Sequence, residues 1–166
     1  QGLVVAVATT AVALGTVAVA IPPAITNGAD PRELLVTVQT SEAVPAINDR
    51  LRELRRTGAI GPILVDQRDS GAWPWAWYLH GLGDVGYVTI DPTQPLPEGY
   101  DVYILSASTE LPELPEGFSA ERFALRRWWL PDYGNVSVGD IARWMLTRET
   151  WNDTGSSDQY LVVRQP

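Results

Sequence analysis

The feature that most constrains this chain is the apolar run at its beginning. Positions 3–21 contain no ionisable side chain, and the first such side chain along the chain is Asp30. At 1.5 Å per residue, a helix over this run is about 30 Å long, which matches the hydrocarbon core of a bilayer. We therefore predict a transmembrane helix over residues 1–23, ended by Pro22 and Pro23.

Two other interpretations of this run are less favourable. A cleaved signal peptide has an apolar stretch of about 7–15 residues preceded by basic residues, whereas this run is longer and no basic residue precedes it. A core helix of a soluble protein has a polar stripe, and this run has none. The sequence therefore predicts a location in the membrane, with the bilayer itself as one partner.

One face of the predicted helix is built from small residues. Ala8, Ala11, Gly15 and Ala18 recur at helical spacing. Small residues allow another helix to approach closely, which predicts packing against other transmembrane helices or subunits. The alternative is that alanine is simply common in such segments.

The charged residues all belong to the remainder of the chain, which we divide into a connector (24–31) and one domain (32–166). The net charge is −8, with no lysine, one histidine and no cysteine. An acidic surface without a basic run makes nucleic acid and anionic headgroups poor partners. Without cysteine, disulfides and thiolate metal sites are excluded, and we predict no cofactor. The acidic flank after the apolar run favours an extracytoplasmic domain, periplasmic or on the cell surface.

The domain has the pattern of an α/β fold. Apolar runs predict strands over 34–38, 62–65, 86–90, 101–105, 121–130 and 160–163, and helical spacing predicts helices after Ser41 and over 70–80 and 137–148. The early alternation of strands and helices favours a mainly parallel sheet with helices on both faces. Shorter connections later in the chain predict an antiparallel pair at one edge.

Two aspartates mark the candidate site, because each follows a predicted strand. Asp66 and Asp91 are predicted to lie beyond the carboxyl ends of neighbouring strands, where parallel sheets bind ligands. The alternative is that aspartate is simply a good loop and capping residue. With one histidine and no metal-ligand cluster, we predict no catalytic residue and no metal site. The predicted ligand-binding residues are Asp66, Arg68, Asp69, Trp73, Trp75, Tyr78 and Asp91.

Tryptophans form the densest motif of the chain. On a helix Trp73 and Trp77 share one face, while Trp75 and Leu79 share another, so at least one pair is expected in the core. The other pair is free to stack on sugar rings or to anchor the chain at a membrane or partner. In the strand over 121–130, Trp128 and Trp129 point to opposite sides, one buried and one exposed.

The segment from Asp66 to Leu79 has the form D-x-x-D-S-x-x-W-P-x-x-W-Y-L. With the preceding apolar helix and the strand after Asn152, it resembles the C-terminal part of the flippase-activity-associated membrane proteins, relatives of the dolichyl-phosphate-mannose-type glycosyltransferases. In such enzymes the catalytic acids lie in an early extracytoplasmic loop. The resemblance therefore implies an extracytoplasmic accessory domain that holds a glycan or a partner and has no catalysis of its own.

Two functions remain open at this point. The first is a glycan-binding accessory domain of a glycosyltransferase-like membrane protein. The second is a single-span accessory or structural subunit of a larger membrane protein complex, for example a respiratory or photosynthetic one.

Overall fold

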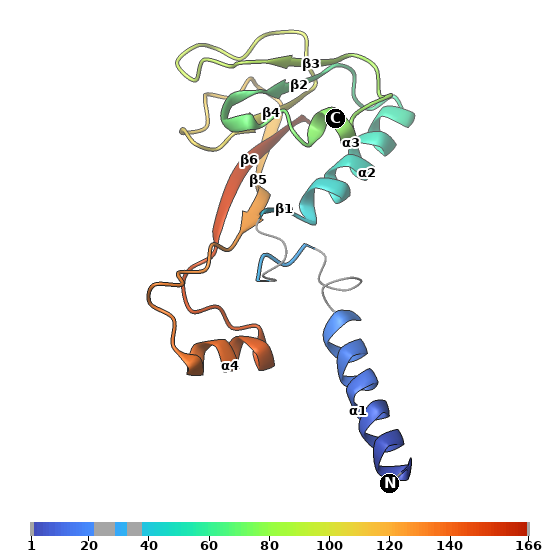
Figure 1. Cartoon of the computed structure of the whole chain (residues 1–166). Coiled ribbons are helices and arrows are strands. Elements are labelled where there is room, and N and C mark those ends of the chain that lie inside the picture. The colour runs from blue at the N-terminus through green and yellow to red at the C-terminus, as the bar shows by residue number, and fades with distance from the viewer. Residues whose placement is uncertain (1, 22–28, 33–37, 166) are drawn as a thin grey trace. The chain divides into compact units, whose positions relative to one another are not determined.

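The computed structural model describes residues 2–21, 29–32 and 38–165 (Figure 1). They form two compact units: an N-terminal unit (Gln1–Gln39 with Trp129–Thr154) and a sheet unit (Thr40–Trp128 with Gly155–Pro166). The helices are α1 (Gly2–Ile21), α2 (Ala43–Arg56), α3 (Trp75–Tyr78) and α4 (Val138–Thr147), and the strands are β1 (Val38–Thr40), β2 (Ile63–Asp66), β3 (Val85–Val88), β4 (Val102–Ser106), β5 (Phe118–Trp128) and β6 (Gly155–Arg164).

The sheet is mixed, with the strand order β1-β5-β6-β4-β2-β3. Strand β2 pairs in parallel with β3 and β4, whereas β6 pairs antiparallel with both β4 and β5. The α/β class and the antiparallel pairing of the later strands are therefore confirmed, but the prediction of a mainly parallel sheet is wrong, because the sheet is mixed. A parallel pair needs a long crossover connection, such as the loop from β3 to β4, whereas the later strands β5 and β6 pair antiparallel.

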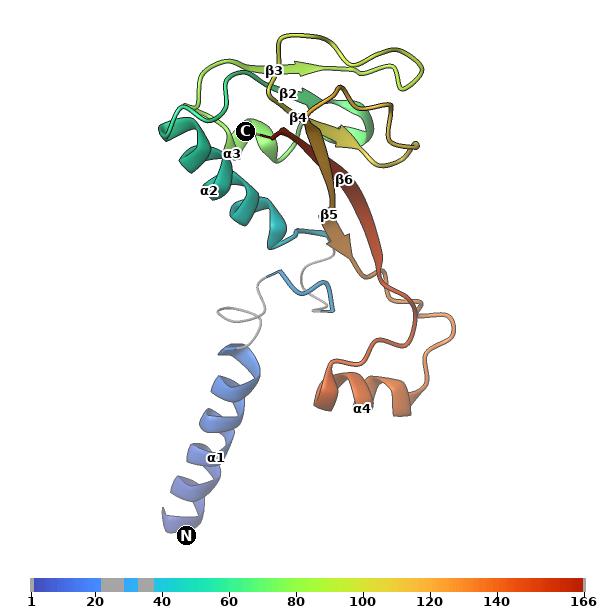
Figure 2. The same cartoon turned by 180° about the vertical axis from the view of Figure 1, so that it is seen from behind.

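Within the described residues, helices cover one face of this sheet. Helices α2 and α3 lie on the same side (Figures 1 and 2), where Val44, Ile47 and Leu51 pack with Trp75 in one hydrophobic core. The opposite face buries a second core under the loops around residues 90–100 and 111–114. The prediction of helices on both faces is therefore wrong, because proline-rich loops cover the second face.

Helix α2 follows directly from its sequence. Val44, Ile47 and Leu51 recur at spacings of three and four, and all are buried. Ser41 fixes its beginning: its backbone N–H donates to Leu125 O at 3.1 Å and its Oγ accepts from Ala43 N at 3.3 Å. The helix predicted after Ser41 is therefore confirmed.

The N-terminal unit begins with α1, so the helix predicted over the apolar run is present. Eleven of its 20 residues are alanine, glycine or threonine. Within the described residues, no helix is both long and apolar enough to cross a membrane. The predicted small-residue face, including Ala8 and Gly15, is exposed on the helix, and its packing partner stays a prediction. Most of the strand predicted over 34–38, and the connector over 24–28, lie outside the described residues.

The other part of the N-terminal unit is a tryptophan cluster beside α4. Trp129 is buried and packs on Trp151 and Trp144, with ring centroids 4.6 and 6.3 Å apart. A capping box between Ser137 and Asp140 begins α4. The helix predicted over 137–148 is confirmed, and its apolar side is exposed rather than buried.

Candidate functional site

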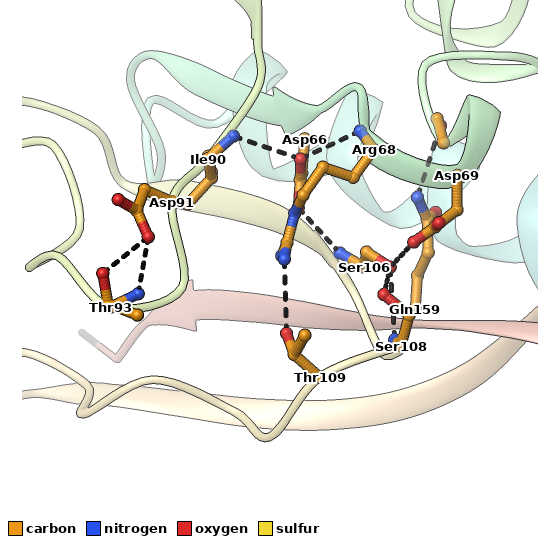
Figure 3. Close-up of polar contacts among 11 residues, drawn as sticks. Asp66, Arg68, Asp69, Ile90, Asp91, Thr93, Ser106, Ser108, Thr109 and Gln159 are labelled. Atoms are coloured by element: carbon orange, nitrogen blue, oxygen red, sulfur yellow. Dashed lines mark hydrogen bonds and ion pairs between the residues drawn. The ribbon is translucent and has the colours of Figure 1, made fainter.

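Asp66, the last residue of β2, connects the ends of three strands (Figure 3). Its carboxylate is fully buried. It accepts hydrogen bonds from the backbone N–H of Arg68 at 3.0 Å, of Ile90 just after β3 at 3.3 Å, and of Ser106 at the end of β4 at 3.2 Å. Asp66 is thus a structural centre at the carboxyl edge of the parallel strands.

Arg68 neutralises this buried carboxylate. Its guanidinium donates to Asp66 Oδ2, with Nε at 2.8 Å and the second nitrogen at 2.7 Å, and its side chain is 17% exposed. A third nitrogen reaches Thr109 Oγ1 at 3.3 Å in the loop after β4. The pair therefore ties the loop after β2 to the loop after β4, and a carboxylate buried in this way needs such a partner.

Asp69 is presented differently, because its side chain is exposed. Its backbone and that of Ser70 lie in the left-handed region, with φ of 53° and 58°, a conformation that aspartate tolerates better than most residues. Asp69 Oδ2 accepts a hydrogen bond of 2.6 Å from Ser106 Oγ, which lies 2.9 Å from Ser108 Oγ (Figure 3). The hydroxyls of Ser106 and Ser108 lower the pKa of Asp69 below its ordinary value, so this carboxylate stays charged at neutral pH.

Gln159 of β6 packs against the same loop. Gln159 Oε1 accepts from the indole N–H of Trp75 at 2.7 Å, and its Nε2 donates to Gly71 O at 3.3 Å. A Cβ at Gly71 would lie 2.6 Å from Gln159 Nε2 and 2.7 Å from Asp66 O. Glycine at position 71 therefore lets the loop close onto Gln159.

An open cavity of about 340 Å³ lies at this edge of the sheet unit. We call it the serine–aspartate cavity. Hydroxyls, two carboxylates, one guanidinium and one indole share its wall, contributed by the loop after β2, the end of β4 and the paired strands β5 and β6. Its lining residues are Asp69, Ser106, Ala107, Ser108, Arg122, Trp128, Ser156, Ser157 and Asp158.

Trp128 supplies the aromatic part of the wall. It is half-buried at the end of β5 and pairs with Gly155 at the start of β6. A Cβ at Gly155 would lie 2.3 Å from Trp128 Nε1 and 2.5 Å from Cε2, closer than any real contact. The indole therefore lies against the backbone of β6 only because position 155 has no side chain.

Arg122 and Asp158 form the opposite part of the wall. The guanidinium of Arg122 contacts Asp158 Oδ2 at 2.9 and 3.0 Å, and it lies 6.0 Å above the ring of Tyr160. The other oxygen of this carboxylate, Asp158 Oδ1, is buried and accepts no hydrogen bond. Asp158 therefore contributes to the cavity wall through its ion pair with Arg122.

The predicted polar site residues lie on two neighbouring loops, and the predicted aromatic ones lie elsewhere. Asp66, Arg68 and Asp69 come together, and Asp91 lies on the adjacent loop, where Thr93 Oγ1 and N donate to it at 2.7 and 2.9 Å (Figure 3). The hydroxyl of Thr93 lowers the pKa of Asp91. Of the predicted set, only Asp69 lines the serine–aspartate cavity.

The predicted aromatic residues do not line this cavity. Trp75 is completely buried in the core with Leu79, and Tyr78 packs against the same core. Trp73 and Trp77 are 61% and 65% exposed. The predicted division of the two faces is therefore confirmed, and the burial of Trp75 leaves it no surface on which a glycan could stack.

The cavity residues that sequence reasoning missed come from the antiparallel half of the sheet: Ser106, Ser108, Arg122, Trp128, Ser156, Ser157 and Asp158. One signal for them exists in the sequence: the alternation of Trp128 and Trp129 predicted that one of the two is exposed, and the structure buries Trp129 and leaves Trp128 half-buried. Among the described residues, no group of three or more histidine, aspartate or glutamate side chains is arranged to hold a metal ion.

Comparisons of the chain with protein-family models, with curated proteins and with solved structures found no match. The candidate site is therefore interpreted from its own geometry.

Proposed function

We propose that this chain is a non-catalytic, carbohydrate-binding accessory domain of a glycosyltransferase-like membrane protein. In this proposal the serine–aspartate cavity holds the sugar, α1 attaches the chain to the membrane protein, and the sheet unit lies on the extracytoplasmic side. The observation that supports it best is the combination of an indole, several hydroxyls and two carboxylates around one cavity.

This combination matches the chemistry of a sugar ring. A sugar has a weakly apolar face of C–H groups and a rim of hydroxyls, so it is bound by an aromatic surface together with polar side chains. Trp128 offers the aromatic surface, while Asp69 and the serines offer acceptors and donors. The volume of about 340 Å³ is at the lower end of ordinary ligand pockets, about 300–1,000 Å³, which suits one sugar residue.

The state of the carboxylates favours binding over catalysis. A general acid or base works best when its pKa lies near the operating pH. The pKa of Asp69 is instead lowered by hydroxyl donors, and Asp158 is paired with Arg122. Both groups therefore suit a permanent hydrogen-bonding role towards sugar hydroxyls.

The membrane context of the proposal comes from α1 and from the resemblance of the segment between Asp66 and Leu79. Side chains of α1 such as Leu3, Val12 and Leu14 are 79%, 69% and 65% exposed. A contiguous apolar surface of this kind usually marks a contact with protein or lipid. This supports attachment of the chain through α1.

The test is saccharide binding by the full chain in mild detergent. Binding of neutral monosaccharides and oligosaccharides is detected by saturation-transfer NMR. We expect binding that Trp128→Ala removes, because the aromatic surface is lost. Trp73→Ala is the matched control, since Trp73 is exposed but lies outside the cavity. Absence of saccharide binding, or an equal loss in both variants, would overturn the proposal.

A second candidate function is supported by α4. Val138, Ile141, Met145 and Leu146 lie on one side of this helix and are 85%, 43%, 63% and 85% exposed. Such a surface suits an accessory subunit of a larger membrane complex. Purification from the native membrane in mild detergent distinguishes the two: stoichiometric partners lost in Leu146→Glu support the subunit, whereas a lone chain contradicts it.

A further inference from the structure

The serine–aspartate cavity carries an excess of negative charge. Its ionisable side chains are Asp69, Arg122 and Asp158. Arg122 and Asp158 form an ion pair at 2.9 Å, so their charges compensate one another. Asp69 is hydrogen-bonded by the hydroxyl of Ser106 at 2.6 Å, which stabilises its charge without neutralising it. One negative charge therefore remains at the wall.

The neighbouring arginines are engaged elsewhere. Arg68 has its guanidinium on the buried carboxylate of Asp66, at 2.7 Å from Oδ2. Arg126 donates to the carbonyl oxygens of Ser70 and Trp73. The charge of Arg68 acts on Asp69 only from a distance. Among the described residues, no arginine forms an ion pair with Asp69, so a ligand that enters the cavity meets a carboxylate without a contacting cation.

The uncompensated carboxylate of Asp69 is also a strong hydrogen-bond acceptor. Asp69 Oδ2 accepts from Ser106 Oγ at 2.6 Å, and an ionised carboxylate has further lone pairs for the donors of a ligand. A ligand that donates hydrogen bonds is therefore favoured beside Asp69, because bonds to a charged acceptor are stronger than neutral ones. An ammonium group offers three donors and no acceptor, whereas a phosphate or carboxylate offers acceptors and a repelled charge.

We infer that the serine–aspartate cavity selects a saccharide that carries a free amine, with the ammonium group held at Asp69, over neutral sugars and over phosphorylated or carboxylated ones. The inference rests on the proposed carbohydrate binding and narrows it to one class of ligand. If the sugar is linked to a lipid through phosphate, the phosphate lies outside the cavity.

The test compares glucosamine, glucose and glucosamine 6-phosphate with the full chain in mild detergent at about pH 6, where aspartate is ionised. We expect glucosamine to bind about tenfold more tightly than glucose, because one additional ion pair acts in a partly exposed site. Glucosamine 6-phosphate is expected to bind more weakly than glucosamine, because its phosphate is repelled.

Asp69→Asn removes the charge while retaining an acceptor oxygen, and asparagine tolerates the left-handed backbone. It is expected to reduce the glucosamine advantage to less than about threefold. Asp91→Asn is the matched control, because Asp91 is also an exposed aspartate held by a hydroxyl but does not line the cavity. An equal effect in both variants would overturn the inference.

A second measurement needs no variant. As the pH is raised and the amine of glucosamine loses its proton, its affinity should fall to that of glucose. Equal binding of glucose and glucosamine at every pH would contradict the preference for an amine, while the proposed carbohydrate binding would still hold. Failure of all three sugars to bind would remove the proposed function as well.

Discussion

The strand-end network around Asp66 and the cavity wall around Asp69 lie in the same loop, three residues apart, yet their carboxylates have different environments. Asp66 is fully buried and receives three backbone N–H groups and an arginine. Asp69 is exposed and receives serine hydroxyls. Position at a strand end is therefore not enough to identify a ligand-binding residue, because the hydrogen-bonding capacity of the carboxylate nearest the strand is already used by backbone N–H groups and an arginine.

The largest expected effect is on Asp66. Asp66→Ala leaves the guanidinium of Arg68 and three buried backbone N–H groups without their acceptor. Removing one partner of a buried pair costs about 3–5 kcal/mol, so the free energy of unfolding should fall by that amount in urea denaturation of the full chain. Asp69→Asn is the control, because asparagine tolerates the left-handed backbone at this position, and its loss should stay below about 1 kcal/mol. Similar losses of unfolding free energy in the two variants would contradict the different structural roles of Asp66 and Asp69.

Sequence reasoning found the part of this edge that local patterns encode. Strands followed by aspartate placed Asp66 and Asp91 on neighbouring loops, since the ends of parallel strands meet at one edge of a sheet. The spacing of Val44, Ile47 and Leu51 predicted the buried face of α2. Helical spacing in the tryptophan motif predicted that Trp75 and Leu79 lie on a different face from Trp73 and Trp77.

The rest of the cavity depends on pairings between distant segments. Trp128 meets Gly155, and Arg122 meets Tyr160, only through the antiparallel register of β5 with β6, which shifts between Ala124 and Arg126. No local period encodes that register, and a shift by one residue would turn each side chain to the other face. The composition of the cavity therefore could not be predicted from single segments.

The next effect tests whether the two regions are coupled. Gly71→Ala introduces a Cβ that would lie 2.7 Å from Asp66 O and 2.8 Å from Arg68 O. These are backbone atoms that cannot move away easily, so we expect a loss of about 1–3 kcal/mol in the free energy of unfolding, together with weaker saccharide binding. Gly139→Ala in α4 is the control, because its Cβ would meet Ser137 Oγ at an ordinary 3.6 Å. A neutral Gly71→Ala would show that the loop adjusts independently of the strand ends.

A smaller effect on stability, with a clear effect on binding, is expected at Gly155. Gly155→Ala forces the indole of Trp128 out of a position where the new Cβ would lie 2.3 Å from Nε1. Since Trp128 is half-buried, the cost in stability should be about 1 kcal/mol, measured by denaturation. Saccharide binding should fall as far as in Trp128→Ala, and the double variant should lose no more than either single one. Additive losses would mean that Gly155 acts on the cavity by another route.

The smallest expected effect is electrostatic and confined to the cavity wall. The hydroxyl of Ser106 is the largest cause of the lowered pKa of Asp69, so Ser106→Ala should raise that pKa towards its ordinary value, as followed by NMR of the carboxyl carbon. Thr93→Val is the matched control, because Thr93 has the same role for Asp91, and this variant should leave the pKa of Asp69 unchanged.

The same hydrogen bond also affects the pH dependence of stability. A pKa that is lowered in the folded state stabilises the protein at pH values above the pKa of the unfolded chain. That contribution disappears as the pH falls through the folded value. Ser106→Ala should therefore weaken the acid dependence of stability below about pH 4 and leave it unchanged between pH 5 and 8. An unmoved pKa of Asp69 would mean that its charge is set by groups outside the serine hydroxyls, and the contrast with Asp66 would then no longer rest on those hydrogen bonds.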